Sequence, residues 1–238
     1  MEIPARLSRT ADLLGRDAVL RIMKAKVAVF GLGGVGSFAA EALARSGVGS
    51  FVLIDGDDVE ESNLNRQLFA LCSTIGMPKV EAAKRRIEDI NPSCRVEARK
   101  LFYLPGCEGL IDGCDCVIDA MDTVTAKLAL AGECEQKGVK LFSAMGTGNK
   151  KDPSRLKIGD IAETSVCPLC RIMRRELKKR GISRLCVVWS DEEPALFETS
   201  GETRSSGRPV PASCAFVPST AGLLLCSAAV KYIIGENE

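Results

Sequence analysis

Short apolar runs rich in β-branched residues alternate with longer amphipathic segments through the first three fifths of the chain. The apolar runs predict buried strands. Because helix-length segments separate these runs, we expect a Rossmann-like, doubly wound α/β fold, with a mainly parallel sheet and helices on both faces. The predicted strands are KVAVF (26–30), SFVLI (50–54), CRVEAR (94–99), CDCVIDA (114–120) and VKLFSA (139–144).

Helical periodicity fills the intervals between these strands. The clearest segment is PKVEAAKRRIEDI (78–90), which has an amphipathic pattern and a proline near its start. The other predicted helices cover residues 37–45, 63–71 and 123–137. Together these elements predict a nucleotide-binding part over about residues 1–150 of a single domain, 1–238.

The remainder, about residues 151–238, is less regular, and we expect it to face the substrate. It is predicted to contain a helix, a strand and a polar loop rich in Gly and Pro (165–180, 184–190 and 191–212).

An apolar segment, AFVPSTAGLLLCSAAVKYII (215–234), has the composition of a membrane span. Pro218 and Ser219 are expected to begin its helix, which leaves about 16 residues, short for a bilayer. Lys231 also interrupts it. The segment therefore predicts a helix buried on the sheet rather than a membrane partner.

The composition narrows the chemistry. The chain has a net charge of +1, so any nucleic-acid site must be local. It has no histidine, which excludes His-based triads, a His general base and His metal ligands. Eleven irregularly spaced cysteines and a charged N-terminus without an apolar stretch predict buried thiols and a cytoplasmic location.

A glycine-rich turn follows the first predicted strand, in VAVFGLGGVG (27–36), and a predicted helix follows the turn. Such a turn lets phosphates approach the backbone N–H groups at the start of the helix. Asp55 ends the second strand, where a carboxylate can bind ribose hydroxyls. These features alone favour NAD. The glycines are Gly31, Gly33, Gly34 and Gly36.

The residues after Asp55 favour a more anionic ligand than NAD. Asn63, Arg66 and Gln67 follow closely, and Lys79 begins the next helix. Cations and amides in this crevice suit a triphosphate. Asp122 follows the fourth strand, at the topological switch point, where a carboxylate beside phosphates can bind Mg²⁺. We therefore predict ATP and Mg²⁺, with an NAD-dependent oxidoreductase as the weaker alternative.

Four motifs, GLGGVG, LIDGDDVEESNLNRQ, GMPKVEAAKRRIEDINP and VIDAMD, resemble the ubiquitin-activating-like superfamily of the ThiF and MoeB enzymes. The resemblance implies that a carboxylate attacks the α-phosphate of ATP, giving an acyl-adenylate and pyrophosphate. It implies that Asp55 holds the ribose, that Asn63, Arg66 and Lys79 contact phosphates, and that Asp122 binds Mg²⁺. Catalytic roles are implied for Arg66, Lys79 and Asp122.

A further implied residue is Arg9, in LSRTADLLG. It matches a family arginine that reaches the nucleotide of the other subunit. The resemblance therefore implies a homodimer in which Arg9 has a catalytic role.

Three longer stretches, GDIAETSVCPLCRIMRRELKKRGI, VIDAMDTVTAKLAL and AFVPSTAGLLL, resemble one branch, the tRNA threonylcarbamoyladenosine dehydratases. This branch implies ATP-dependent activation of the carboxylate of threonylcarbamoyladenosine in tRNA, followed by cyclisation with net loss of water. It also implies a cysteine-desulfurase and sulfur-acceptor system as candidate partners. Adenylation of a ubiquitin-like or sulfur-carrier protein is the alternative, and a non-catalytic nucleotide-binding scaffold is a third hypothesis.

The segment CRIMRRELKKR concentrates positive charge on a predicted helix. This spacing suits contacts with an RNA backbone, although a solvated face or an acidic protein partner would also fit. The predicted nucleic-acid-binding residues are Arg171, Arg174, Arg175, Lys178, Lys179 and Arg180.

A single C-x-x-C pair, Cys167 and Cys170, precedes this basic segment. Zinc sites in the superfamily commonly use two such pairs, and no second pair or histidine completes four ligands here. We interpret the two cysteines as ordinary thiols at a helix start, and keep a redox pair as an alternative.

Overall fold

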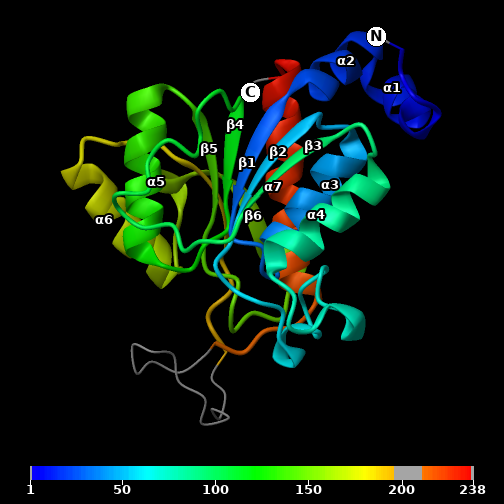
Figure 1. Cartoon of the computed structure of the whole chain (residues 1–238). Helices are drawn as coiled ribbons and strands as arrows, with labels where there is room; N and C mark the ends of the chain where they lie inside the picture. The colour runs from blue at the N-terminus through cyan, green and yellow to red at the C-terminus, as the bar shows by residue number, and fades with distance from the viewer. Residues whose placement is uncertain (1, 196–210, 237–238) are drawn as a thin grey trace.

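The computed structural model describes residues 2–195 and 211–236. In this part of the chain seven strands form one sheet in the order β3-β2-β1-β4-β5-β7-β6, parallel except at the β6–β7 pair (Figure 1). The strand order reverses between β1 and β4. The predicted doubly wound α/β fold is confirmed. The strands are β1 (Lys26–Phe30), β2 (Ser50–Ile54), β3 (Arg95–Arg99), β4 (Cys116–Asp119), β5 (Lys140–Ala144), β6 (Leu156–Asp160) and β7 (Cys186–Ser190).

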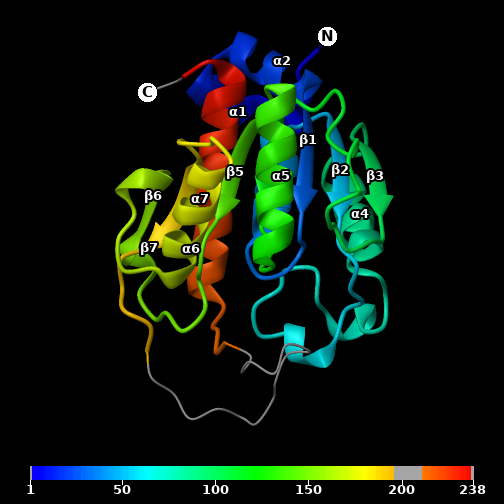
Figure 2. The ribbon, with the colours of Figure 1, turned by 90° about the vertical axis from the view of Figure 1, so that its left-hand side faces the viewer.

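Helices cover both faces of the sheet. α3, α4 and α7 pack on one face and α5 and α6 on the other, while α1 and α2 lie at the amino ends of the strands (Figures 1 and 2). The helices are α1 (Ser8–Leu14), α2 (Arg16–Lys24), α3 (Gly36–Ser46), α4 (Lys79–Ile90), α5 (Val124–Lys137), α6 (Pro168–Lys179) and α7 (Phe216–Ile234).

Alternating side chains of the central strands build two separate cores. On β1, Val27 and Val29 join the core beneath α3, α4 and α7, whereas Ala28 and Phe30 join the core beneath α5 and α6. Both sides of the strand are therefore buried. This explains why the sequence shows continuous apolar runs rather than polar alternation.

α7 is the apolar helix of the C-terminal part. It packs against α3 and against strands β4 to β7. By length and composition it could cross a membrane, with a mean hydropathy of 1.5, but half of the same window is buried in the fold. A Cβ atom at Gly222 would lie 2.3 Å from the carbonyl oxygen of Val35, so the two backbones meet closely. The predicted buried helix is confirmed, although it begins at Phe216 rather than at Pro218.

One other predicted helix is absent, and another begins later than predicted, both for local reasons. Residues 63–71 form turns rather than a helix, because the Asn63 side chain accepts the backbone N–H of Glu60 and closes a 3₁₀ turn. The helix predicted from residue 165 begins at Pro168, after Val166 adopts a positive φ of 61°. The helices α1 and α2 and the edge strand β6 were not predicted. Most of the predicted 191–212 loop lies outside the described residues.

Candidate nucleotide-binding site

A cleft of about 940 Å³ opens at the carboxyl ends of the parallel strands. The connections that follow β1, β2, β4 and β5 all contribute to its lining. The cleft therefore lies at the switch point of the sheet, where open α/β folds bind ligands. All the predicted nucleotide-binding residues except Gly36 line it: Gly31, Gly33, Gly34, Asp55, Asn63, Arg66, Gln67, Lys79 and Asp122.

The glycine turn forms one wall of the cleft. Gly31 has a φ of 85°, a conformation that favours glycine, and its N–H donates to the carbonyl oxygen of Ile54 at 2.8 Å. A Cβ atom at Gly36 would lie 1.8 Å from the Gly31 carbonyl oxygen. Gly36 thus closes the turn from behind instead of lining the cleft, so its requirement for glycine is structural.

Asp55 anchors the turn to the end of β2. Its Oδ2 accepts the backbone N–H of Leu32 at 2.6 Å, and its Oδ1 accepts that of Asp57 at 2.9 Å. Burial raises the pKa of Asp55, and the nearby charge of Lys79 partly offsets this effect. A carboxylate has about four acceptor positions, so these two bonds leave room for ribose hydroxyls.

Lys79 begins α4 and extends into the cleft. Its Nζ lies 2.8 Å from Oδ2 of Asp57, and its backbone N–H donates to the carbonyl oxygen of the same residue. The lysine side chain is 8% exposed and the aspartate side chain 52%. An ammonium carries three N–H donors, so the contact with Asp57 leaves two for phosphate oxygens.

Arg66 lies on the loop between β2 and α4, next to the glycine turn. Its Nη1 donates to the carbonyl oxygen of Ser62 at 2.9 Å and to Oδ1 of Asn65 at 2.8 Å. These contacts hold the guanidinium on its own loop and still leave donors for an anion. Buried Asn63 and Gln67 lie on the same loop, so together with Arg66 three polar side chains of one segment line this wall.

Two aspartates lie at and just after the end of β4. One is buried within the fold and the other is exposed. Oδ2 of Asp119 accepts Nζ of Lys127 at 2.9 Å and the hydroxyl of Ser143 at 2.6 Å, all within the fold. Asp122 lies at the exposed rim of the cleft, where the hydroxyl of Thr123 donates to it at 3.4 Å. Asp122 is therefore the carboxylate of this strand end that a ligand can approach.

Phe102, which the sequence pattern did not indicate as a site residue, also lines the cleft. Its side chain is 66% exposed. A Cβ atom at Gly56 would lie 2.6 Å from the ring, so the ring covers Gly56, the residue after Asp55. The next residue, Tyr103, points inward and its hydroxyl donates to Oε2 of buried Glu133 at 2.8 Å. The available signal was an aromatic residue three positions after the third predicted strand.

The basic residues of α6 fall into two groups. Arg174 donates to the carbonyl and hydroxyl oxygens of Thr164, so it braces the turn before the helix instead of facing a partner. Glu176 on the same helix pairs with several of the exposed cations. The exposed cations are Arg171, Arg175, Lys178, Lys179 and Arg180. The first turn of α6 lines the cleft, so this surface begins at its edge.

Arg9 is exposed on α1, at the amino ends of the strands (Figure 2). The nucleotide cleft lies at the opposite ends, so Arg9 does not line the cleft of its own chain. A role for Arg9 thus requires a second subunit.

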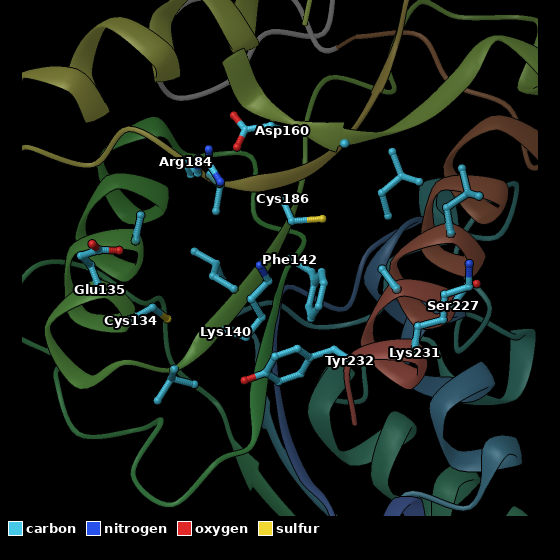
Figure 3. A pocket seen from close by; sticks show the side chains of 18 of the residues that line it. Cys134, Glu135, Lys140, Phe142, Asp160, Arg184, Cys186, Ser227, Lys231 and Tyr232 are labelled. Carbon is cyan, nitrogen blue, oxygen red and sulfur yellow. The ribbon is translucent and has the colours of Figure 1, made fainter. Parts of the chain in front are cut away.

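A second pocket, of about 670 Å³, lies at the amino ends of β5 and β7 (Figure 3). Phe142, Cys186 and Tyr232 are among its lining residues. Burial raises the pKa of Cys186, which makes this thiol a weak nucleophile. No predicted site residue lines this pocket, so the expected chemistry belongs to the other end of the sheet.

The fold and the cleft define a Rossmann-like nucleotide-binding protein with cations for a polyphosphate and without a P-loop. The chain belongs to the ThiF family, whose sequence profile matches residues 7–238. The predicted family is confirmed.

Two kinds of relative extend this result. The tRNA threonylcarbamoyladenosine dehydratase of Bacillus subtilis is 44% identical over 243 residues, covering 97% of this chain and 95% of the relative. The crystal structure of Escherichia coli TcdA in complex with ATP matches with a TM-score of 0.88 and 34% identity, covering 99% of this chain and 98% of that one. The complex of the same enzyme with AMP gives a TM-score of 0.89.

Proposed function

We propose that this protein is an ATP-dependent tRNA threonylcarbamoyladenosine dehydratase. The observation that carries the proposal is the likeness to the B. subtilis dehydratase across almost the whole of both chains. The cleft supports it, because it gathers a glycine turn, a ribose-binding carboxylate and cations at one switch point.

The proposed reaction has two steps. The carboxylate of threonylcarbamoyladenosine attacks the α-phosphate of ATP, forming an acyl-adenylate and releasing pyrophosphate. The ureido nitrogen of the same modified base then attacks the activated carbonyl and releases AMP, so the base becomes cyclic with net loss of water. Ring closure is intramolecular and needs no enzyme nucleophile, which fits a site without histidine.

In this proposal the chain holds ATP through groups that face the cleft. Asp55 accepts the ribose hydroxyls, while Lys79 and Arg66 donate to phosphate oxygens and offset the charge that develops on them. Phe102 covers the residue next to the ribose carboxylate and offers an aromatic face to the adenine ring.

Mg²⁺ fits the same end of the cleft. Asp122 supplies an exposed carboxylate beside the glycine turn, and carboxylate oxygens are ligands that Mg²⁺ prefers. When bound with ATP, Mg²⁺ would neutralise phosphate charge.

We further propose that the exposed cations of α6 bind the tRNA backbone. They start at the edge of the cleft, where the modified base must enter, and phosphate contacts of this kind need no sequence-specific groups. Arg174 is left out, because it is committed to Thr164.

The remaining parts of the proposal concern the assembly and its location. A homodimer would bring Arg9 of one subunit to the cleft of the other, and a cysteine-desulfurase and sulfur-acceptor system is a candidate partner. A reducing cytoplasm suits a chain whose eleven cysteines are all free thiols.

The direct test is to incubate the purified protein with threonylcarbamoyladenosine-containing tRNA, ATP and Mg²⁺. Mass spectrometry of nucleosides extracted under mild conditions should show the loss of one water, with AMP formed in equal amount. An Arg66→Ala variant should lose both products. Pyrophosphate exchange stimulated by a carrier protein ending in Gly-Gly, with no change in the tRNA, would instead support carrier adenylation.

The tRNA surface can be tested separately. Reversing two charges with Arg171→Glu and Lys178→Glu should weaken tRNA binding and reduce its dependence on salt, while ATP binding is retained. The matched control is Arg16→Glu with Lys24→Glu, two exposed cations of α2 at the far end of the sheet. Equal losses in both double variants would contradict a localised tRNA surface.

A further inference from the structure

The C-x-x-C pair at the start of α6 takes no part in the proposed reaction. Cys167 is the N-cap residue of the helix, Pro168 is its first residue, and Cys170 follows within the first turn. Each of the two thiols is the first cause of the shift in the other's pKa, so the two groups influence each other's protonation. Both residues are buried and lie within one turn of the chain.

The surroundings of Cys167 favour a thiolate. The Cys170 thiol is the largest influence, and backbone N–H groups of Cys170, Gly146 and Leu169 also donate to the sulfur. Together they outweigh burial and lower the pKa of Cys167 to about 5. The positive end of the α6 dipole acts in the same direction. Cys170 has the opposite tendency, since its pKa is raised, first by its hydrogen bond to Cys167 and then by burial.

A buried lysine supplies a second, independent observation. Lys150 is 4% exposed, and its Nζ makes no hydrogen bond within the described residues. Burial lowers the pKa of Lys150, and the negative charges of Glu192 and then of Cys167 partly offset this effect. Because burial disfavours the ammonium, a negative charge at Cys167 adds to that of Glu192 in reducing the cost of burying Lys150.

The backbone before the pair is strained. Val166 is a β-branched residue at a φ of 61°, which such residues rarely adopt. Cys167 itself is 3% exposed, but its neighbours Ser165, Val166 and Pro168 are all exposed. The buried sulfur is therefore carried by a turn that itself lies at the surface.

The pair also lies directly behind the wall of the nucleotide cleft. Gly146, Pro168 and Leu169 line the cleft. A Cβ atom at Gly146 would lie 3.5 Å from the sulfur of Cys167. Any change in the bonding of this sulfur therefore acts on cleft-lining backbone.

Other cysteines give the contrast. Burial raises the pKa of Cys94, Cys116, Cys134 and Cys226, as expected for inert thiols in a core. Within the described residues no group of three or more cysteine, aspartate and glutamate side chains could hold a metal, so the pair stands as a dithiol.

We propose that Cys167 and Cys170 are a redox-active dithiol that closes to a disulfide and thereby reshapes the wall of the nucleotide cleft. The oxidant is a low-molecular-weight disulfide. The Cys167 thiolate attacks one sulfur of it and releases one thiolate, leaving a mixed disulfide. Cys170 then loses its proton and attacks the sulfur of Cys167, which releases the second thiol. Two protein thiols are oxidised and one disulfide is reduced.

The test equilibrates the full chain with defined ratios of reduced and oxidised glutathione, followed by acid quenching, alkylation and mass spectrometry of peptides. The wild-type protein should form the internal Cys167–Cys170 disulfide. In Cys170→Ser a mixed disulfide should accumulate at Cys167, because the second step is blocked. In Cys167→Ser, Cys170 should stay reduced. Cys72 is an exposed thiol, so Cys72→Ser is the matched control and should behave as the wild type.

Two results would overturn the proposed dithiol chemistry. One is a Cys167 and Cys170 pair that stays reduced under conditions that already modify Cys72. The other is a mixed disulfide on Cys170 in the Cys167→Ser variant, which would reverse the assigned order of attack.

The effect on the cleft is measured by ATP titration of the reduced and oxidised wild-type protein, which needs no substitution. We expect oxidation to weaken ATP binding roughly tenfold, while Cys167→Ser with Cys170→Ser shows one affinity under both conditions. Equal wild-type affinities would contradict the link to the cleft. Neither measurement uses tRNA, so this inference can fail or stand independently of the proposed tRNA substrate.

Discussion

Two lysine–aspartate pairs lie near the carboxyl ends of β4 and β2, the two strands that flank β1, and their contacts have almost the same length. Lys127 contacts Asp119 at 2.9 Å, and Lys79 contacts Asp57 at 2.8 Å. Both lysine side chains are buried, but the two aspartates differ in exposure. Lys127 and Asp119 are 0% and 1% exposed, whereas Lys79 and Asp57 are 8% and 52% exposed.

The buried Lys127–Asp119 pair has a structural role only. Nζ of Lys127 also donates to the hydroxyl of Ser143 and to the carbonyl oxygen of Ala144, so all three of its donors have acceptors. In the pair at the cleft, Asp57 is exposed to solvent, and Lys79 keeps donors that a phosphate can accept. Ion-pair geometry alone therefore does not separate structural from functional charges; exposure and remaining donors do.

Breaking the buried pair should have the largest effect. Lys127→Met leaves the buried Asp119 carboxylate without its cation, and we expect a loss of about 3–5 kcal/mol in the free energy of unfolding. Urea denaturation measures it. Lys127→Met with Asp119→Leu should recover part of the loss, because no buried charge remains. A single variant as stable as the wild type would contradict the structural role.

Breaking the cleft pair should affect ATP more than stability. In Lys79→Ala the exposed Asp57 stays solvated, so we expect a loss of at most about 1 kcal/mol in unfolding free energy. The lost charge-assisted bonds to phosphate are each worth about 1.5–3 kcal/mol, so calorimetry should show ATP affinity reduced about 10- to 100-fold. A large loss of stability with unchanged ATP affinity would show that Lys79, like Lys127, has a structural role and does not bind phosphate.

Phe102 tests an uncharged contribution to ATP binding, for comparison with the two charged pairs. Phe102→Ala should reduce ATP affinity by about 1–3 kcal/mol, the value of one base stacked on an aromatic ring. Phe102→Tyr should restore affinity, and binding of inorganic tripolyphosphate should not change. A Phe102→Ala variant that raises the KM for tRNA but leaves ATP affinity intact would assign the ring to the tRNA base instead.

Glu41 of α3 contacts Arg86 of α4 and Arg45, so a largely buried carboxylate is held by two partly exposed guanidinium groups. Although burial raises the pKa of Glu41, hydrogen bonds from Arg86 and Arg45 outweigh it and lower the pKa below its ordinary value of 4.5. Ionised Glu41 therefore stabilises the fold above pH 4.5, and this contribution is lost as the pH falls through the lower folded pKa.

Glu41→Gln should therefore cost at most about 1 kcal/mol at pH 7. Its difference from the wild type should shrink toward zero in acid, as measured by urea denaturation across pH. A difference that grows on acidification would contradict the assigned direction.

Much of the fold and of the cleft could be predicted, because short sequence patterns indicate where the strands lie and where they end. Apolar runs located the central strands, and the glycine turn, Asp55 and Lys79 lie at element ends whose spatial position follows from the parallel topology. β6 escaped prediction because LKIGD has little apolar content, and it is defined by pairing with β7 at the edge of the sheet.

The orientations of several side chains depend on long-range packing and could not be predicted from the sequence. Phe102 and Tyr103 are adjacent aromatic residues, and only the fold sends one into the cleft and the other to Glu133. On α6, charge and spacing are alike for Arg174 and Arg175. Only the turn at Thr164 distinguishes the bracing residue from the exposed one.

α7 has a consequence for the order in which the protein can fold during synthesis. This helix follows all seven strands that the described residues form, yet it packs on α3 and on strands β4 to β7. While the ribosome still holds residues 216–234, the apolar surface of the nucleotide-binding part remains uncovered and open to aggregation. The nascent cleft therefore depends on a segment translated after all of its lining loops, and a nascent chain arrested before residue 216 is expected to need a chaperone.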